Sequence, residues 1–296
     1  MEADFDHLRG WVGRTEARAD LLTPRLAEAF DATLDEPPRA YESGDTAPLG
    51  IHWCLGNPAV RASGLGRDGH PKREGFMPPV PLPRRMWAAG KLTFAAPLLV
   101  GLNVTRQTTI AAIDFKQGRT GPLCFLELDH LYLQEGVTCV TERQTLVYRE
   151  DPKPGEARSE AGANPVPPEG RIVQTLTPDA VMLFRYSALT FNGHRIHYDL
   201  AYAREVEGYP GLVVHGPLIA TFLMRACAAA RPEHRLGELS FRGLSPSFAG
   251  RPLSVMLLEE GGGLRAGAES EGRARRARDS PRPRGHRRGR SGCGGR

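Results

Sequence analysis

The chain has 296 residues, of which 40% are hydrophobic and 25% are charged, the balance of a globular protein rather than a fibrous or wholly disordered one. Its longest nearly uncharged helical stretch, residues 217–230, is well short of the roughly 20 residues that a membrane span needs. Residues 1–20 contain acidic side chains and no apolar signal core, so we expect a cytoplasmic protein without a membrane partner.

The N-terminal half, residues 1–150, contains a predicted helix and a long loop. Thr23-Pro24 is typical of an N-cap followed by proline in the first helical turn, and apolar residues recur after it at helical spacing. Residues 56–85 are rich in glycine and proline and are expected to form an ordered loop.

Three strand-like runs follow this loop. They cover residues 98–115, 123–133 and 137–149. The middle run alternates apolar and polar side chains well, and the turn Gln134-Glu135-Gly136 joins the last two runs as a hairpin.

Residues 151–170 separate the two halves. They contain five prolines, no aromatic residue and a single large aliphatic side chain, so burial cannot repay their ordering entropy and we interpret them as a linker. Beyond the linker, residues 171–260 partly repeat the earlier pattern. Strands are predicted at residues 171–177, 211–215, 237–245 and 251–258.

The second half also contains an apolar helix over residues 216–230. Its only charged side chain is Arg225, so the helix must be buried. A buried helix wrapped by an antiparallel sheet, once in each half, is an α+β arrangement of two similar modules.

The densest group of polar residues lies between Tyr186 and Asp199. His194 and His197 are three residues apart, and Asn192 lies five residues before His197. Three interpretations are open: solvated loop histidines, a zinc pair, for which a third ligand at a recognisable spacing is missing, and a general acid/base histidine held by its neighbours.

A second group lies where residues 213–217, Val-Val-His-Gly-Pro, enter the apolar helix. The amides at a helix N-terminus point outward with the positive end of the helix dipole, and Gly216 has no side chain to block approach. Such a position can stabilise an oxyanion. The alternative is a packing glycine at a tight turn, but an acid/base histidine about twenty residues away favours a catalytic pair.

The segments FNGHRIHYDLAYA and YPGLVVHGPLIATFL resemble the motif of MaoC-like enoyl-thioester hydratases. Within that family the chain is most similar to the two-module members, the type-2 hydroxyacyl-thioester dehydratases and the mesaconyl-CoA and itaconyl-CoA hydratases. The segments DGHPKREGFMPPVPLPRRMWAAGKLTF, KQGRTGPLCFLEL and LVYRE also match that subgroup. The resemblance covers roughly residues 5–258 and implies a double hotdog fold, with the thioester entering between the modules.

The resemblance also implies roles for individual residues. His197 matches the catalytic histidine and Gly216 the glycine whose amide polarises the thioester carbonyl, while Asn192 occupies a position that is Asp in single-module hydratases. Because an amide cannot take up a proton, His197 would be the only acid/base and Asn192 would orient the water. Substrate binding is expected from further residues: His194, His215, Tyr186, Arg84 and Arg85.

The implied function is reversible hydration of a 2-enoyl thioester, with coenzyme A the expected carrier and Arg84 and Arg85 placed to meet its phosphates. No metal and no other cofactor is required. The N-terminal module lacks the histidine motif, so it is expected to be non-catalytic and to shape the acyl pocket. Alternatives are a hotdog thioesterase, which usually needs a carboxylate near the helix, and an acyl-thioester-binding module without activity. A homodimer is left open.

Residues 261–296 carry the basic charge of the chain. Eleven arginines and three acidic residues give this region a charge of +8 and leave −3 for the rest, so the folded part has no electrostatic preference for nucleic acid. With ten glycines and no Val, Ile, Met, Phe, Trp or Tyr, it is predicted to be a disordered Arg/Gly-rich tail. It would be a solvated segment without function, or would bind RNA or anionic lipid through charge alone.

A third interpretation of the tail is a frameshift. The family pattern implies further strands after residue 258, but the apolar residues stop there and are replaced by residues with GC-rich codons. On this interpretation the catalytic module at residues 171–260 is incomplete.

The five cysteines lie far apart, are odd in number and form no Cys-x-x-Cys pair. This spacing indicates neither a disulfide framework nor a thiolate metal site and predicts buried, reduced thiols. They are Cys54, Cys124, Cys139, Cys227 and Cys293.

Overall fold

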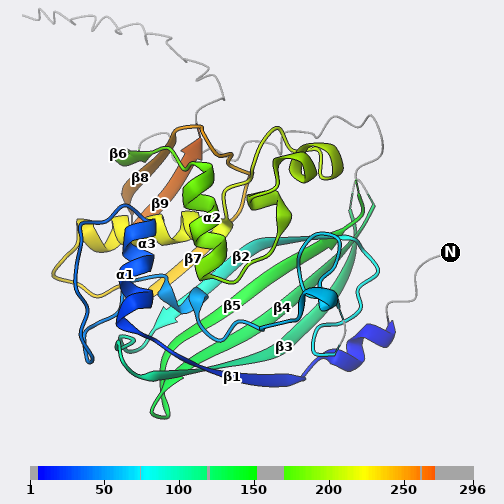
Figure 1. Ribbon diagram of the computed structural model, residues 1–296, viewed down its shortest axis with the longest axis horizontal. Coiled ribbons are helices and arrows are strands. Elements are labelled where there is room, and N and C mark those ends of the chain that lie inside the picture. Colours follow the sequence, from blue (N-terminus) through cyan, green and yellow to red (C-terminus); the bar gives the residue numbers. More distant parts are fainter. Residues whose placement is uncertain (1–5, 74, 119–120, 152–169, 261, 271–296) are drawn as a thin grey trace, which may run out of the picture.

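The structure is a computed structural model that describes residues 6–73, 75–118, 121–151, 170–260 and 262–270. In these residues two antiparallel sheets enclose three α-helices and several short helical turns (Figure 1). The interior of the expected linker and the tail beyond Ser270 lie outside the described residues. No helix in the described part is long and apolar enough to cross a membrane.

Five strands of the first module form one antiparallel sheet in the order β1-β3-β4-β5-β2. Their bounds are β1 Thr15–Leu21, β2 Arg84–Phe94, β3 Asn103–Gly118, β4 Gly121–Gln134 and β5 Val137–Arg149. The three predicted strands and their hairpin are confirmed, with Glu135 and Gly136 at φ values of 48° and 80° in the turn. The first predicted strand begins at residue 103 rather than 98.

Two strands of this sheet, β1 and β2, were not predicted from the sequence. Strand β1 is an edge strand with mostly polar, exposed side chains, so it carries little periodic signal. Strand β2 follows directly on a proline-rich loop and has two arginines at its start. Both pair along their whole length with neighbours that were predicted.

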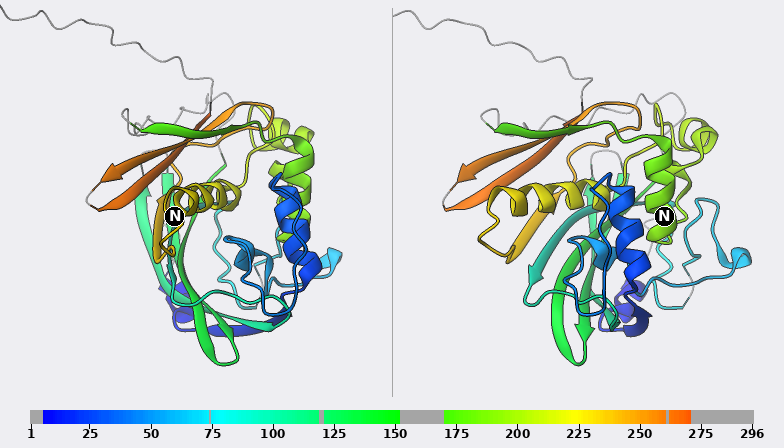
Figure 2. Two further views of the ribbon diagram at one scale, coloured as in Figure 1. Left: turned by 90° about the vertical axis from the view of Figure 1, so that its left-hand side faces the viewer. Right: turned by 60° about the vertical axis from the view of Figure 1, so that its left-hand side comes forward.

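The helices of the first module are short. Helix α1, Pro24–Thr33, begins as predicted, and the Thr23 hydroxyl accepts a hydrogen bond of 3.1 Å from the Leu26 amide. The 3₁₀ turn η2, Ile51–Cys54, is buried and lies within the curve of the sheet (Figure 2). Two further turns are η1, Asp6–Trp11, and η3, Ala62–Gly64.

The second module contains the predicted apolar helix α3, Gly216–Ala230, beneath a three-stranded sheet of order β6-β8-β9. Its other elements are β6 Arg171–Leu176, α2 Ala180–Leu189, β7 Glu238–Arg242, β8 Leu253–Glu260 and β9 Gly263–Ser270. Helix α3 is buried as expected, and its one charged side chain, Arg225, forms ion pairs of 2.5 Å with Asp31 and 2.8 Å with Glu36.

Two expectations for the second half were wrong, and one helix was not predicted. Residues 211–215 form no strand beyond an isolated bridge between Val213 and Phe248, because their backbone groups bind loops. Helix α2 was not predicted, and Asp179 caps it by accepting a 2.7 Å hydrogen bond from the Met182 amide. Strand β9 lies in residues assigned to a disordered tail, so the folded part continues to at least Ser270.

The modules meet where β7 pairs with β2, which joins the second module to the edge of the first sheet. Gly90 makes this contact possible, because a Cβ at this position would lie 2.5 Å from the Phe241 ring. That ring also packs at 5.6 Å from Trp87 and 6.3 Å from Trp53. One hydrophobic core cluster accordingly contains residues of both modules.

The two modules place their strands in a similar order. In the first module the sheet order is β1-β3-β4-β5-β2, so the second strand along the chain lies beside the fifth. In the second, the first, third and fourth strands are β6, β8 and β9, and the second is β7. Among the described residues no strand lies between β9 and β7, the position that the fifth strand occupies in the first module.

The cysteines behave as expected where the structure describes them. Cys54, Cys124, Cys139 and Cys227 are free and buried. Burial raises the pKa of each thiol above its ordinary value. They are therefore protonated, unreactive core residues. Cys293 lies outside the described residues.

Candidate active site

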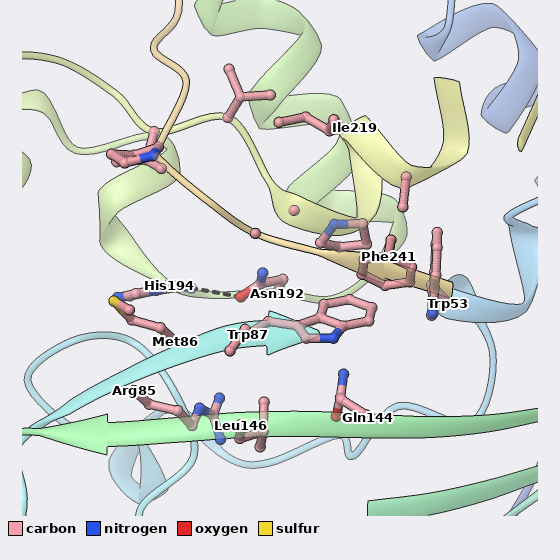
Figure 3. Close-up of a pocket in the computed structure, with 18 of the residues that line it drawn as sticks. Trp53, Arg85, Met86, Trp87, Gln144, Leu146, Asn192, His194, Ile219 and Phe241 are labelled. Atoms are coloured by element: carbon pink, nitrogen blue, oxygen red, sulfur yellow. Dashed lines mark hydrogen bonds between the residues drawn. The ribbon is translucent and has the colours of Figure 1, made fainter. Parts of the chain in front are cut away.

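A cavity of about 2150 Å³ lies between the modules, and His197, Asn192 and Gly216 are in its wall. Figure 3 shows Asn192 at this cavity. Strands β2 and β5 line one side, and the loop after α2 together with the start of α3 lines the other. Residues of β7 and β9 also line the cavity. Part of the cavity volume therefore lies between β9 and β7, where the described residues supply no strand. Aromatic and aliphatic walls make it suitable for an acyl chain; they include Trp53, Trp87, Leu146, Ile219 and Phe241.

The loop between α2 and α3 carries the histidine motif and is held internally. It contains the 3₁₀ turn η4, Arg195–His197, and the π-helical turn η5, Tyr202–Val206. The guanidinium of Arg195 donates to Asp199 at 2.7 Å, and the other carboxylate oxygen of Asp199 accepts from the Tyr202 amide at 3.0 Å. Asp199 therefore stabilises the loop rather than binding a metal.

His197 is buried, and its tautomer follows from one hydrogen bond. Its Nδ1 lies 2.7 Å from the carbonyl oxygen of Val213. A carbonyl can only accept, so Nδ1 carries the proton and Nε2 keeps its lone pair. Burial lowers the pKa of His197 to about 4, which leaves the ring neutral at pH 7. The geometry therefore provides a base at Nε2.

Asn192 is oriented by the same loop. Its Oδ1 accepts a 3.0 Å hydrogen bond from the backbone amide of His194 (Figure 3). Because the oxygen is used in this way, the side-chain NH₂ group is the part of Asn192 that is available to a molecule in the cavity. The preceding residue, Phe191, adopts a positive φ of 48°, which turns the chain sharply at this point.

Gly216 is the first residue of α3 and lines the cavity. Its amide belongs to the first turn of the helix and has no acceptor within the helix. A Cβ built at Gly216 would meet no atom within 4 Å, so the space beside this residue is open. The predicted oxyanion position is thus accessible from the same cavity as His197 and Asn192.

His215 and Tyr186 lie behind His197 and do not line the cavity. The His215 ring stacks on His197 with centroids 3.6 Å apart, and its Nε2 lies 2.8 Å from the Ser187 hydroxyl. Tyr186 is fully buried with its ring 5.0 Å from His215. His215 thus packs on the core side of the His197 ring and Tyr186 packs on His215, so the cavity wall contains neither of these two residues.

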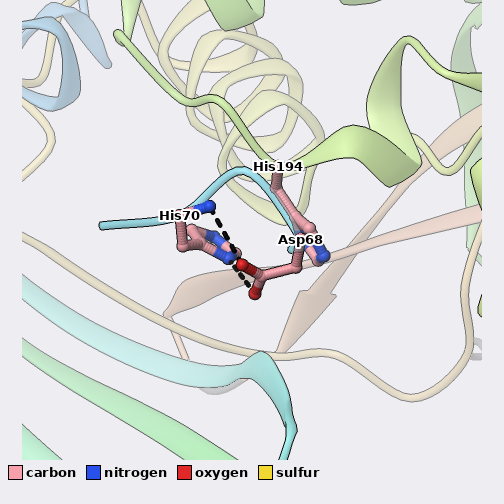
Figure 4. A group of neighbouring side chains, drawn as sticks. All are labelled: Asp68, His70 and His194. Carbon is pink, nitrogen blue, oxygen red and sulfur yellow. Dashed lines mark hydrogen bonds and ion pairs between the residues drawn. The ribbon is translucent and has the colours of Figure 1, made fainter. Parts of the chain in front are cut away.

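A turn of the first module brings an Asp-His pair to the catalytic loop (Figure 4). The carboxylate of Asp68 accepts from the Nδ1 and from the backbone amide of His70, at 2.8 Å and 3.1 Å. The His70 ring packs 4.2 Å from the ring of His194, which is itself 5.5 Å from that of His197. Sequence analysis missed this pair, although DGH belongs to a segment that matched the family.

The candidate ligand atoms of Asp68, His70 and His194 lie within 4.8 Å of one another, which is the spacing of a possible cation site. However, both oxygens of Asp68 are hydrogen-bonded to His70, and a cation would have to displace that contact. The positive charge of Arg85 also lowers the pKa values of His70 and His194 and opposes a second cation. Hydrogen bonding accounts better for this group than metal ligation does.

The turn at residues 67–70 is fixed to the catalytic loop by backbone contacts. The Asp68 carbonyl accepts from the Arg195 amide at 2.9 Å, and the Arg67 carbonyl accepts from the Arg195 guanidinium at 3.1 Å. Gly69 lies against Gly193 so closely that a Cβ on Gly69 would be 1.9 Å from the Gly193 carbonyl oxygen. The first module thus contributes to the site itself.

The two arginines at the start of β2 have different surroundings. Arg84 is buried, and its guanidinium forms an ion pair with Glu207 and donates to the Glu207 carbonyl at 2.9 Å. This contact holds the end of η5, and Arg84 also lines the cavity. Arg85 is half-buried and lines the cavity.

Comparison with known proteins identifies the family of the chain. Residues 50–249 match the family model of hydroxyacyl-thioester dehydratase type 2. The chain is 42% identical over 251 residues to a mesaconyl-C(4)-CoA hydratase from Chloroflexus aurantiacus, covering 85% of this chain and 89% of the relative. It is 29% identical over 241 residues to the mitochondrial hydroxyacyl-thioester dehydratase type 2 of Schizosaccharomyces pombe, covering 72% and 78%.

Solved structures show the same fold at low sequence identity. HtdX of Mycobacterium tuberculosis has a TM-score of 0.61 at 16% identity, covering 87% of this chain and 94% of that one. Another Mycobacterium tuberculosis protein, described as a double hotdog fold, has a TM-score of 0.56 at 15% identity, covering 88% and 90%. The fold is thus an α+β double hotdog, and the chain is a hydro-lyase that belongs to the hydroxyacyl-thioester dehydratase type 2 family.

Proposed function

We propose that His197, Asn192 and Gly216 catalyse the reversible hydration of a 2-enoyl coenzyme A ester. The observation that carries this assignment is that a neutral imidazole with a free Nε2, a donor amide and an open helix N-terminus line one cavity. These are the three groups that addition of water to a conjugated thioester requires: a base, a group that holds the water and a site for the negative charge.

In the hydration direction, the Asn192 NH₂ group donates to the oxygen of a bound water and His197 Nε2 removes one of its protons. The oxygen forms a bond to Cβ, the Cα–Cβ π electrons move toward the thioester, and negative charge accumulates on the carbonyl oxygen. The Gly216 amide stabilises this enolate. His197 then returns the proton to Cα, so that water has been added across the double bond and the enzyme is unchanged.

The reverse sequence dehydrates a 3-hydroxyacyl thioester. His197 removes the Cα proton, the enolate forms at Gly216, and the proton is returned to the departing hydroxyl group. Because the imidazole begins and ends neutral in both directions, its low pKa is compatible with activity near pH 7. His215 stacks on the His197 ring, and the Asp68–His70 pair packs on His194, whose ring lies 5.5 Å from that of His197.

The test is incubation with crotonyl-CoA, measuring the absorbance of the conjugated enoyl thioester and the release of free thiol together. Loss of conjugation without thiol release is the expected result. Thiol release would instead indicate a thioesterase, and no change in either signal with crotonyl-CoA or mesaconyl-CoA would contradict the proposed activity.

A further inference from the structure

His70 of the first module has a fixed tautomer, as His197 has. Its Nδ1 lies 2.8 Å from the Asp68 carboxylate (Figure 4). Burial raises the pKa of Asp68, but the hydrogen bonds from His70 lower that pKa to about 2, so the carboxylate is ionised at pH 7 and can only accept. The ring proton of His70 therefore lies on Nδ1. Because burial lowers the pKa of His70 to about 4, Nε2 keeps its lone pair.

This lone pair is available to a molecule in the cavity. His70 lines the cavity, whereas Asp68 does not. Among the described residues no protein group forms a hydrogen bond with Nε2 of His70. An acceptor of this kind, with its tautomer set from behind, fits a ligand atom that donates a hydrogen bond.

The turn that carries His70 is docked on the loop that carries Asn192 and His197. A Cβ on Gly69 would be 1.9 Å from the carbonyl oxygen of the residue after Asn192. The His70 ring packs 4.2 Å from the ring of His194, which lies 5.5 Å from that of His197. The acceptor of the first module is thus beside the groups that hold and deprotonate the water.

The proposed hydration leaves one hydrogen of that water without an acceptor. A water molecule has two hydrogens and two lone pairs. One lone pair forms the bond to Cβ, and the other accepts from the Asn192 NH₂ group. His197 removes one hydrogen, and the second stays on the oxygen and becomes part of the 3-hydroxyl group. This second hydrogen needs an acceptor for the water to have a single orientation.

The ring of His194 is the other imidazole beside this position. Among the described residues its ring nitrogens have no hydrogen-bond partner that fixes the tautomer. Each of them can therefore present a donor or an acceptor. His70 is restricted to an acceptor by Asp68 and is the better preorganised of the two rings.

We propose that His70 is a further catalytic residue, whose Nε2 accepts a hydrogen bond from the hydrogen that stays on the nucleophilic water. The same contact holds the 3-hydroxyl group in the dehydration direction. No proton moves to His70, and Asp68 is a positioning residue that acts through its ring. The inference rests on the proposed hydration at His197, and it makes the first module part of the catalytic machinery.

Asp68→Asn tests the contact without removing a ring. The new amide oxygen can still accept from the His70 backbone amide, as Asp68 does at 3.1 Å, but its NH₂ group then donates to Nδ1 and moves the ring proton to Nε2. Nε2 would point a donor at the water. We expect kcat for crotonyl-CoA to fall by about 10- to 100-fold.

The Michaelis constants separate this role from a structural one. Crotonyl-CoA has no hydroxyl group, so its KM should stay near the native value in Asp68→Asn. The KM for 3-hydroxybutyryl-CoA, measured in the dehydration direction, should rise, because that ester carries the hydroxyl group that His70 binds. A general disturbance of the site would raise both KM values.

His70→Phe is the second variant, because it keeps a ring to pack on His194 but has no nitrogen. It should lower kcat like Asp68→Asn. Asp129→Asn is the matched control for loss of a carboxylate: Asp129 pairs with Arg143 outside the cavity wall, and its variant should keep the native kcat. Circular dichroism checks that each protein is folded.

Native kcat in folded Asp68→Asn and His70→Phe would overturn the inference. A loss of kcat in His194→Phe but not in His70→Phe would also overturn it, because the acceptor would then be His194. A rise in KM for both esters would assign the turn a structural role instead. These results leave the proposed function standing, since hydration of crotonyl-CoA by the native enzyme tests it separately.

Discussion

At the residue scale, the site depends on which nitrogen of His197 carries its proton. The Val213 carbonyl fixes that proton on Nδ1, and stacking on His215 at 3.6 Å fixes the plane of the ring. The direction in which the base points is thus set by Val213 and His215. In this arrangement His197 can be removed without leaving an unpaired charge, because the ring is neutral.

We expect His197→Ala to lower kcat for crotonyl-CoA by about 10²- to 10⁴-fold, the usual contribution of a general acid/base. The variant should remain folded, as checked by circular dichroism and thermal unfolding. His234→Ala changes an exposed histidine outside the cavity and should keep native turnover. A folded His197→Ala protein with near-native kcat would remove His197 from the mechanism.

At the scale of elements, the catalytic loop is shaped by a turn that comes from the other module. Residues 67–70 contact residues 193–195 through backbone hydrogen bonds and through the close approach of Gly69 and Gly193. This approach requires glycine at both positions, since any side chain would meet the opposing backbone. The orientation of Asn192 and His194 therefore depends on a segment far away in the sequence.

Gly69→Ala should disturb this contact, and Gly75→Ala provides the matched control. Both glycines have a φ of +86°, so alanine is strained equally at both, but a Cβ meets the Gly193 carbonyl oxygen at 1.9 Å from Gly69 and nothing within 4 Å from Gly75. We expect Gly69→Ala to have a lower melting temperature than Gly75→Ala. Its kcat should be at least tenfold below that of Gly75→Ala. Equal kcat values in the two variants would show that the turn does not position the catalytic loop.

The elements that the sequence predicted are those with strong local signals. The Thr23 cap, the alternation of β4 and the nearly uncharged α3 can be read without knowing their neighbours. The edge strand β1 and the helix α2 carry weaker patterns, because many of their side chains are exposed. Val213 and Val214 failed to form a strand because their backbone groups bind His197 and Ser247 instead.

The site residues also divide into those with a local sequence signal and those without one. His197, Asn192 and Gly216 lie close together in the sequence within a recognisable motif, and all three reach the cavity. Asp68 and His70 belong to the other module, and only the pairing of the modules brings them to His194. Their partners cannot be inferred from spacing along the chain.

At the scale of the whole molecule, the fold buries many histidines in neutral form. For each, burial is the main cause that lowers the pKa below the ordinary value near 6.5. They are His52, His70, His130, His194, His197 and His215. One buried acid, Glu142, titrates in the opposite sense, because burial raises its pKa to about 7.

We expect the free energy of unfolding to fall as the pH is lowered from about 7 to 5. Below pH 6.5 the unfolded chain binds protons at these histidines, whereas the native fold does not until their depressed pKa values, about 4 for His70 and His197, are reached. Denaturant titrations at pH 5 and pH 7 measure this difference. Glu142→Gln removes the buried acid whose raised pKa opposes the effect of the histidines, so it should make the free energy of unfolding fall more steeply as the pH is lowered. A free energy of unfolding that does not change with pH would contradict burial of neutral histidines.

The strand order of the two modules also supports a prediction about the coding sequence. The first module has its fifth strand, β5, between β4 and β2, whereas the described residues supply none between β9 and β7. Within the described residues β9 and β7 therefore end their sheets with unpaired edges, and such edges promote association between copies. Because β9 extends to Ser270, the frameshift hypothesis now requires a frame change after this residue rather than after residue 258.

If a frame change removes the fifth strand, one of the other two reading frames after codon 270 should encode about 10 to 14 residues of alternating apolar and polar character. Resequencing the coding DNA tests this directly. Restoring that frame should fill the position between β9 and β7, raise the melting temperature and abolish aggregation in size-exclusion chromatography, because it pairs both edges and covers α3. A 296-residue chain that is monomeric, stable and active, with no strand-like sequence in either frame, would show that the second module functions without a fifth strand.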